Sequence, residues 1–266
     1  MKTTLVAAAL VAIAASVHPV SIKPPTQAAT HAAGPPARSE RAVPFHVGEA
    51  LTYDVSWSSF VTAGTAVTTV KEKQTSGGSV AYHLVADGQT TALLQALYTL
   101  HYTMETWLDG FTLLPQRATA SSEEGRRRRV RTTIFDRPAR RARYEIHTST
   151  VVKTDVVIEP DEQDALSAIY VLRTLPLKPG AAVTMPVTDD GAIYRVRFEP
   201  GAVERVRTPI GEMRARTIAT SITDANGRAV GRHLAIWIAE NDQRWPVKLE
   251  AELPAGSFTL TLREAH

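Results

Sequence analysis

The chain has 266 residues, a formal net charge of +3 and a hydrophobic fraction of 44%. That fraction is ordinary for a globular protein and too high for a disordered one. The sequence has no cysteine, which excludes disulfides, thiol nucleophiles, iron–sulfur clusters and cysteine zinc sites, and also excludes lipid attachment through an N-terminal cysteine.

The N-terminus has the pattern of a secretory signal peptide. Lys2 gives it a positive start, an apolar run extends from Leu5 to Val17, and small residues lie near the end of that run. The run is shorter than the roughly 20 apolar residues of a membrane-spanning helix. We therefore predict a cleavable signal peptide at residues 1–17 and a periplasmic location, with an uncleaved N-terminal anchor as the alternative.

Residues 18–41 are rich in Pro, Ala, Thr and Ser and have few large apolar side chains. Such a segment buries too little surface to offset the entropy of ordering it, so we predict a disordered tether. The remaining residues, 42–266, are predicted to form a single β-rich domain.

The hydrophobic period within this domain is mostly two. Apolar and polar side chains alternate at residues 51–57, 183–187, 194–198, 247–253 and 258–262. This alternation is typical of strands with one buried face and one wet face. Turn signals separate the strands, and consecutive strands joined by short turns pair antiparallel. The fold class is therefore mostly β, in a long antiparallel meander.

Two segments break this rhythm. Residues 92–97 (ALLQAL) are interpreted as a short helix or as a loop that crosses the sheet. Residues 161–175 predict a helix, because the first turn is acidic, apolar residues recur at helical spacing and Pro176 ends it. One amphipathic helix within a long meander usually covers the concave face of a curved sheet.

Two single residues carry further expectations. Arg173 lies among apolar residues of the predicted helix, so we expect it to pair with a carboxylate inside the fold. Gly64 falls within a strand pattern, where glycine is otherwise unfavourable, so we expect a bulge or a close backbone approach there.

No combination of residues in the sequence predicts catalysis. There is no HExxH zinc pair, no GxSxG nucleophile turn, no SxxK motif and no glycine-rich phosphate loop. His101 and Glu105 are four residues apart, but a strand places them far apart on one face. We therefore predict a protein that is not an enzyme and that has no metal and no cofactor.

The most conspicuous charged feature is a run of arginines. It lies in a predicted basic hairpin over residues 126–143 and suggests contact with an anionic surface, such as lipid headgroups, lipopolysaccharide phosphates or an acidic partner. The alternative is a solvated face that serves solubility. Nucleic acid is not an expected partner of an exported protein. The candidate contact residues are Arg126, Arg127, Arg128, Arg129 and Arg131.

Three blocks of sequence resemble a known family. They are FHVGEALTYDVSW followed by AGTA, the segment QDALSAIYVLRTLPLKPG, and the closing IWIAENDQRWPVKLEAELPAGSFTLTL. In order and spacing they are similar to the bacterial periplasmic family known as domain of unknown function 3108, over about residues 44–263. The resemblance implies an exported protein without an established activity or catalytic residues. It also implies a curved sheet like the half-barrel of lipoprotein carriers, which cup apolar ligands.

Two functions remain open at this point. In the first, a non-catalytic periplasmic binding protein holds an apolar or lipid-like ligand, or a lipoprotein, in the concave face of its sheet, with peripheral membrane contact. In the second, a structural or scaffold protein of the envelope fills that face with its own side chains. A ligand site takes a cleft of roughly 300 Å³ or more, whereas a packed core leaves almost none. The candidate ligand-binding residues are Leu51, Tyr53, Val55, Trp57, Leu249 and Phe258.

Overall fold

The computed structural model describes residues 39–266 apart from residues 59–60, 77, 93–99, 231–233 and 254–255. The helix expected at residues 92–97 lies, after its first residue, outside the described residues. No helix in the described part is long and apolar enough to span a membrane.

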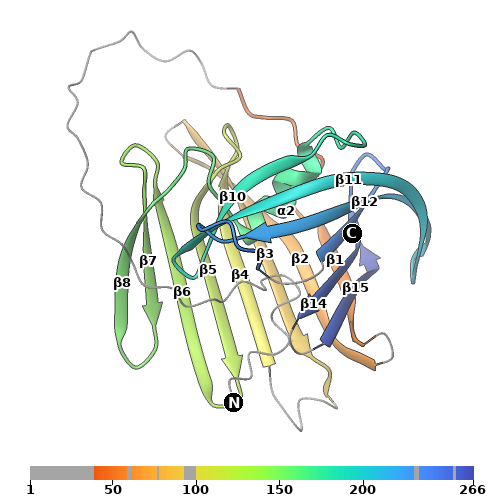
Figure 1. Cartoon of the computed structure of the whole chain (residues 1–266), viewed down its shortest axis with the longest axis horizontal. Coiled ribbons are helices and arrows are strands. Elements are labelled where there is room, and N and C mark those ends of the chain that lie inside the picture. The colour runs from red at the N-terminus through yellow and green to blue at the C-terminus, as the bar shows by residue number, and fades with distance from the viewer. Residues whose placement is uncertain (1–38, 59–60, 77, 93–99, 231–233, 254–255) are drawn as a thin grey trace.

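The described strands form one sheet of 15 strands (Figure 1). The first eight are β1 (Ala50–Trp57), β2 (Val61–Ser76), β3 (Ser79–Thr90), β4 (Leu100–Asp109), β5 (Pro115–Glu124), β6 (Arg127–Asp136), β7 (Arg141–His147) and β8 (Val151–Val157). The others are β9 (Gln163–Asp164), β10 (Val183–Asp189), β11 (Ala192–Thr208), β12 (Gly211–Thr223), β13 (Leu234–Ala239), β14 (Pro246–Leu253) and β15 (Gly256–Ala265).

The sheet is an antiparallel meander whose first and last strands meet in its middle. β1 pairs with β2 on one side and with β15 on the other, and the order from edge to edge begins at β8 and ends at β9. The only parallel pair among the described strands of this sheet joins β9 to β10. The sequence prediction of a mostly β, antiparallel meander is therefore confirmed.

The two edges of the sheet lie near each other although they do not pair as strands. Residues 158–162 alone separate β8 from β9, and so short a segment spans at most roughly 20 Å. Arg137, in the turn after β6, donates from Nη2 to the carbonyl of Glu162 at 2.8 Å and to that of Pro115 at 2.9 Å. The sheet therefore curves into an open half-barrel.

The helix α2 (Ala165–Thr174) lies within this curve. Asp164 caps its N-terminus by accepting from the backbone N–H groups of Leu166 and Ser167, and the hydroxyl oxygen of Ser167 accepts in return from the backbone N–H of Asp164. The helix was predicted to begin at Asp161, which was wrong by four residues. The reason is that Gln163 and Asp164 form β9, so the acidic residues precede the helix.

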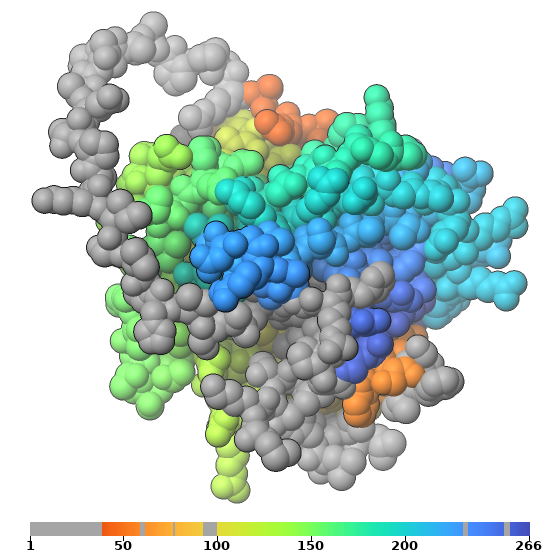
Figure 2. Space-filling model, viewed as in Figure 1, coloured from red at the N-terminus to blue at the C-terminus, as the bar shows by residue number. Residues whose placement is uncertain are grey.

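Helix α2 separates two apolar clusters. The larger one joins the helix to β1 and to β10–β15, and the smaller one joins it to β2–β4 and to Phe45. Phe45 packs edge-on against Tyr82 and Tyr170, with ring centroids 5.4 and 5.1 Å apart. The helix thus fills the middle of the half-barrel, and in the space-filling view β11 and β12 lie across the front (Figure 2).

Gly64 lies at a close backbone approach, as predicted. A Cβ atom at this position would lie 2.3 Å from the carbonyl oxygen of Gln89. The pairing of β1 with β2 also shifts register between Val55, the partner of Gly64, and Ser56. Glycine is needed here because β3 passes too close for any side chain.

Candidate functional site

The predicted ligand-binding residues lie on two kinds of surface. Leu51, Tyr53, Val55, Leu249 and Phe258 are at most 7% exposed and belong to the larger apolar cluster. The sixth residue is Trp57, which lies at the end of β1 and is 42% exposed. The structure therefore brings five of the six together beneath α2 and leaves Trp57 at the margin.

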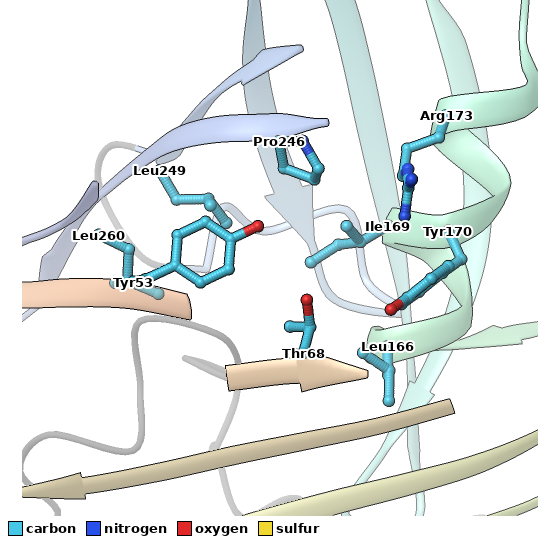
Figure 3. A pocket seen from close by; sticks show the side chains of 9 residues that line it. All are labelled: Tyr53, Thr68, Leu166, Ile169, Tyr170, Arg173, Pro246, Leu249 and Leu260. Atoms are coloured by element: carbon cyan, nitrogen blue, oxygen red, sulfur yellow. The ribbon is translucent and has the colours of Figure 1, made fainter. Parts of the chain in front are cut away.

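The described residues almost fill the space beneath α2. A cavity of about 20 Å³ remains there, which is room for one water molecule and far less than the roughly 300 Å³ of a typical ligand pocket. Figure 3 shows the side chains of helix and sheet meeting across it. Its lining residues are Tyr53, Thr68, Leu166, Ile169, Tyr170, Arg173, Pro246, Leu249 and Leu260.

Arg173 has the buried carboxylate partner that its position predicted. Its two terminal nitrogens lie 2.7 Å from the two carboxylate oxygens of Glu49, and both side chains are 1% exposed. Arg173 also donates to the carbonyl of Gln243 at 2.8 Å. The pair therefore ties α2 to the start of β1 and to the turn after β13.

The arginine run is divided between two environments. Arg126, Arg127, Arg128 and Arg129 are exposed at the β5–β6 turn. Arg131 points inward instead, in the same phase as the buried Thr133 and Phe135, and its side chain is only 12% exposed. Arg131 therefore does not belong to the exposed anionic-contact surface with which the sequence grouped it.

Arg131 anchors a polar cluster between β6, β7 and the β10–β11 turn. It forms an ion pair with Asp190 and donates to the hydroxyl of Tyr102 at 2.9 Å, and the hydroxyl of Tyr144 donates to Asp190 at 3.1 Å. A cavity of about 30 Å³ adjoins these groups, which is room for one or two water molecules.

Asp189 lies beside this cluster without a hydrogen-bond partner for its Oδ2 atom among the described residues. Burial, and after it the charge of Asp190, raises the pKa of its carboxyl group to about 7, while Arg131 opposes the rise. Asp190 forms the ion pair with Arg131, and its negative charge beside the buried Asp189 contributes to the raised pKa of Asp189.

Two of the described histidines contact carboxylates. His101 Nε2 lies 2.6 Å from Asp87, whereas Glu105 lies 3.1 Å from Nε2 of a different histidine, His83. Within the part of the chain that the structure describes, no group of three or more His, Asp or Glu side chains could hold a metal ion.

A larger cavity, of about 290 Å³, opens beside the C-terminal end of α2. We call it the arginine pocket. Its apolar residues are Leu177, Ile238 and Ala239, and its polar residues are Arg216, Glu240, Asn241 and Arg244. Its volume is close to the lower limit of ordinary small-molecule sites.

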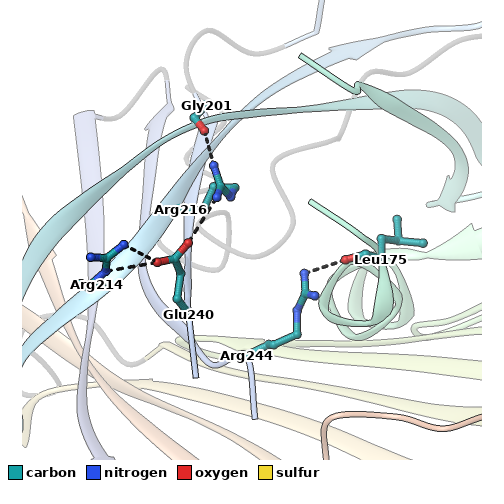
Figure 4. Close-up of polar contacts among 6 residues, drawn as sticks. All are labelled: Leu175, Gly201, Arg214, Arg216, Glu240 and Arg244. Carbon is teal, nitrogen blue, oxygen red and sulfur yellow. Dashed lines mark hydrogen bonds and ion pairs between the residues drawn. The ribbon is translucent and has the colours of Figure 1, made fainter. Parts of the chain in front are cut away.

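The charged side chains of the arginine pocket are fixed by further contacts (Figure 4). Arg216 donates to the carbonyl of Gly201 at 2.8 Å and lies 3.2 Å from Glu240. Arg214 holds the other oxygen of Glu240 at 3.0 Å. Arg244 donates to the carbonyl of Leu175 at 2.6 Å, where a cation complements the C-terminal end of the helix dipole.

The pocket has more positive than negative charge. The guanidinium groups of Arg216 and Arg244 line it and that of Arg214 adjoins it, and among the described lining residues Glu240 alone carries a carboxylate. Burial lowers the pKa of Arg244, and the charges of Arg173 and Arg216 lower it further. The Arg244 backbone has a φ of 51°, a region that side chains other than glycine rarely adopt, and its Nε is buried without a partner among the described residues.

Sequence reasoning did not identify the arginine pocket. One feature of the sequence pointed to an inward position for Arg216, because it shares a strand face with Ile218 and Thr220, which are both buried. Arg244 carried none, since its position in a polar turn is typical of a solvated residue. The pocket joins the end of α2, β12 and the β13–β14 turn, which are distant along the chain.

Comparisons with known proteins agree with this architecture. The model of a family described as "Protein of unknown function (DUF3108)" matches residues 52–263. No curated protein matches the chain. The chain is similar in fold to the "beta-barrel-like protein of domain of unknown function DUF1849" from Brucella abortus, with 9% identity, a TM-score of 0.55, and coverage of 82% of this chain and 97% of that one.

Two further solved structures were found at lower similarity. One is described as "a putative exported protein with YmcC-like fold" from Bacteroides fragilis, with 11% identity, a TM-score of 0.33, and coverage of 86% of this chain and 100% of that one. The other is described as "a putative lipoprotein" from Parabacteroides distasonis, with 7% identity, a TM-score of 0.34, and coverage of 86% and 100%.

Proposed function

We propose that this chain, which belongs to the DUF3108 family, is a non-catalytic binding protein of the cell envelope whose arginine pocket takes the head group of an amphipathic anion. The observation that carries the proposal is the pocket itself. It combines about 290 Å³ of space, an apolar side chain at Leu177 and three guanidinium groups in or beside it, two of which pair with the single carboxylate of Glu240. The proposal includes no chemical step.

The residues that line the pocket favour an anion with a short apolar portion. A carboxylate or phosphate accepts hydrogen bonds from guanidinium groups, and these charge-assisted bonds are among the stronger ones. Leu177, which is partly exposed, offers apolar surface to the carbon atoms next to the head group, whereas Ile238 is only 2% exposed. An inorganic anion would use only the first of these features.

The space beneath α2 limits where the apolar part of a ligand can lie. The cavity that the described residues leave there, about 20 Å³, is far too small for an acyl chain. The concave-face residues Tyr53 and Leu249 therefore support packing rather than ligand contact, and we assign the ligand to the arginine pocket.

Calorimetric titration of the mature protein tests the proposal. Octanoate and octyl phosphate are the probes, inorganic phosphate tests the head group alone, and octyl glucoside is the neutral control. We expect the two amphipathic anions to bind, more weakly as salt rises because screening weakens charge attraction. Octyl glucoside is expected not to bind.

Variants locate the binding. Arg216→Gln is expected to weaken the binding of octanoate at least about tenfold, which is the order of one lost hydrogen bond to a charged group. Arg205→Gln is the matched control, because Arg205 is 79% exposed on β11 and lies outside the pocket. If neither anion binds, or if both variants bind as the parent does, the proposal is wrong.

A scaffold function is the second candidate, and the filled space beneath α2 favours it. In that case Arg244 serves only to hold the end of α2 through the carbonyl of Leu175. Gentle isolation followed by native mass spectrometry separates the two functions. A clean protein mass, together with no binding of either anionic probe, leaves the scaffold function.

Export is part of the proposal. The apolar run from Leu5 to Val17 supports a cleavable signal peptide at residues 1–17. The intact mass of protein isolated from the envelope fraction tests this. A mass that lacks the first 17 or so residues supports cleavage, and the full-length mass indicates an anchor.

Contact with an anionic membrane surface is proposed for the exposed arginines at the β5–β6 turn. Co-sedimentation with vesicles that contain anionic lipid tests it, and a neutral vesicle is the control. Replacing Arg127, Arg128 and Arg129 with Gln is expected to abolish binding at low salt. Equal sedimentation of the variant and the parent would contradict the assignment.

A further inference from the structure

Among the described strands, β8 forms one edge of the sheet. It is the last strand in the sheet order on its side and lies at the border of the molecule in Figure 1. Its valines are unusually exposed, at 52% for Val151, 54% for Val152 and 69% for Val157. An exposed apolar edge strand is a template for pairing with another strand.

The hydrogen bonds at the two ends of β8 show which backbone groups are free to pair. The N–H of Thr148 donates to the carbonyl of Thr150, and the N–H of Ile158 donates to the carbonyl of Arg140. Bonding alternates along an antiparallel pair, so the even-numbered residues of β8 bond to β7. The N–H and C=O groups of the odd-numbered residues, 151–157, therefore point away from the sheet.

The sequence of β8 is complementary to itself when reversed. It reads VVKTDVV, with Thr154 at its centre. In an antiparallel pair of two copies centred there, Lys153 faces Asp155, threonine faces threonine and each valine faces a valine. Cross-strand pairs of opposite charge, of Thr with Thr and of β-branched residues are the favourable ones in sheets.

We propose that β8 pairs with β8 of a second copy of this chain, about a two-fold axis at Thr154, to form a homodimer with one continuous sheet. The interface is isologous, because the same strand contributes on both sides. It rests on none of the residues assigned to ligand binding, so it stands apart from the proposed function.

The charges also specify the register. A shift of two residues in one direction places the lysines of the two copies opposite each other, and a shift in the other direction does the same with the aspartates. Like charges directly opposite are destabilising. Within one chain Lys153 already lies 3.0 Å from Glu145, and Asp155 lies 3.5 Å from Arg143, so the dimer extends an existing ladder of alternating charge.

The other edge of the sheet does not offer the same surface. β9 consists of Gln163 and Asp164 alone, and both are buried. A head-to-tail arrangement of β8 on β9 is therefore excluded for the described strands. A second copy of β8 is the occupant that the edge fits.

Charge exchange tests the dimer. Analytical ultracentrifugation of the full mature chain is expected to show a monomer–dimer equilibrium that shifts with concentration. Lys153→Asp places two aspartates opposite two aspartates, and Asp155→Lys places two lysines opposite two lysines. Each variant alone is expected to dimerise at least about tenfold more weakly than the parent, because both favourable charge pairs across the interface are replaced by repulsion.

Mixing the two variants gives the decisive measurement. Both aspartates of the Lys153→Asp strand then face the two lysines of the Asp155→Lys strand, so every charged pair across the interface is again of opposite sign. The mixture is therefore expected to form heterodimers where neither variant forms homodimers. Lys71→Asp on β2 is the matched control and should dimerise like the parent. Circular dichroism of each variant excludes unfolding as the cause of any loss.

Two outcomes overturn the proposal. One is a parent protein that stays monomeric up to about 1 mM, a concentration at which even a weak specific interface would be populated. The other is a dimer whose affinity is unchanged by either single substitution, which would place the interface elsewhere on the molecule.

Discussion

The covered part of the sheet and its β5–β8 wing are built from the same alternating strands but are stabilised differently. Beneath α2, the described residues of the two larger apolar clusters leave a cavity of about 20 Å³. In the wing, the third cluster contains only Phe135, Ala142 and Ile158 as its buried members among the described residues. The wing is attached to the β10–β11 turn through Arg131 and Asp190 instead. Strand alternation thus forms a sheet, but only an opposing layer gives it a deep core.

The largest expected effect comes from the buried ion pair under α2. Arg173→Ala leaves the Glu49 carboxylate buried and without its cation, and this is expected to lower the free energy of unfolding by about 3–5 kcal/mol. Urea denaturation measures it. Arg195→Ala is the control, because its pair with Glu159 is largely exposed and should contribute about 1 kcal/mol or less. Equal losses in the two variants would contradict the buried assignment.

Truncation of core side chains should separate the two regions directly. Tyr170→Ala, beneath a filled layer, is expected to destabilise the protein by about 2–5 kcal/mol. Ile146→Ala in the wing, where that side chain is only partly buried, should destabilise it by about 1 kcal/mol. The comparison fails if the wing variant loses as much stability as the helix variant.

Gly64 tests how tightly the covered sheet is packed. Gly64→Ala places a methyl group 2.3 Å from a backbone oxygen, so β2 or β3 must move, and we expect a loss of about 1–3 kcal/mol. Gly88→Ala is the matched control on β3, since its nearest neighbour would lie at an ordinary 3.9 Å. Thermal unfolding of the two variants should differ clearly, and matching midpoints would mean that the backbone yields without strain.

Local patterns made much of the covered region predictable. Period-two alternation identified β1, β10, β11, β14 and β15, and the helical spacing of Leu166, Ile169 and Tyr170 identified α2. Arg173 among apolar residues indicated a buried partner, although nothing local could name Glu49, which is 124 residues away. The start of α2 was placed too early because the two residues before it form a strand, β9, through pairing with β10 and not through their own strand propensity.

The candidate site was less predictable because its chemistry arises between distant segments. Arg216 and Arg244 look like ordinary solvated residues until β12, the end of α2 and the β13–β14 turn meet. For the arginine run the error was the opposite one, because a largely buried residue, Arg131, was predicted to be exposed. Its density suggested one surface, whereas Arg131 shares a strand face with the exposed Arg129 and is largely buried because its part of β6 lies against Asp190 and Tyr102.

The smallest expected effect concerns the polar contact between the two regions, and it depends on pH. Burial raises the pKa of Asp189 to about 7 in the folded protein, whereas an unfolded aspartate titrates near 4. Between these values the folded state binds more protons than the unfolded state, so stability falls as pH rises from about 4 to about 7 and then levels off.

Asp189→Asn removes this titration while keeping the shape of the side chain. Between about pH 5 and pH 7 we expect the stability of the variant to decline by about 1–2 kcal/mol less than that of the parent. This difference is smaller than the full pKa shift would give, because Asp189 retains some solvent contact and Arg131 acts on both Asp189 and Asp190. Urea denaturation across this pH range measures the slope, and Asp242→Asn, at an exposed turn, is the control. An identical slope in the parent and Asp189→Asn would show that the carboxyl group is solvated and that the contact between the wing and the β10–β11 turn opens to water.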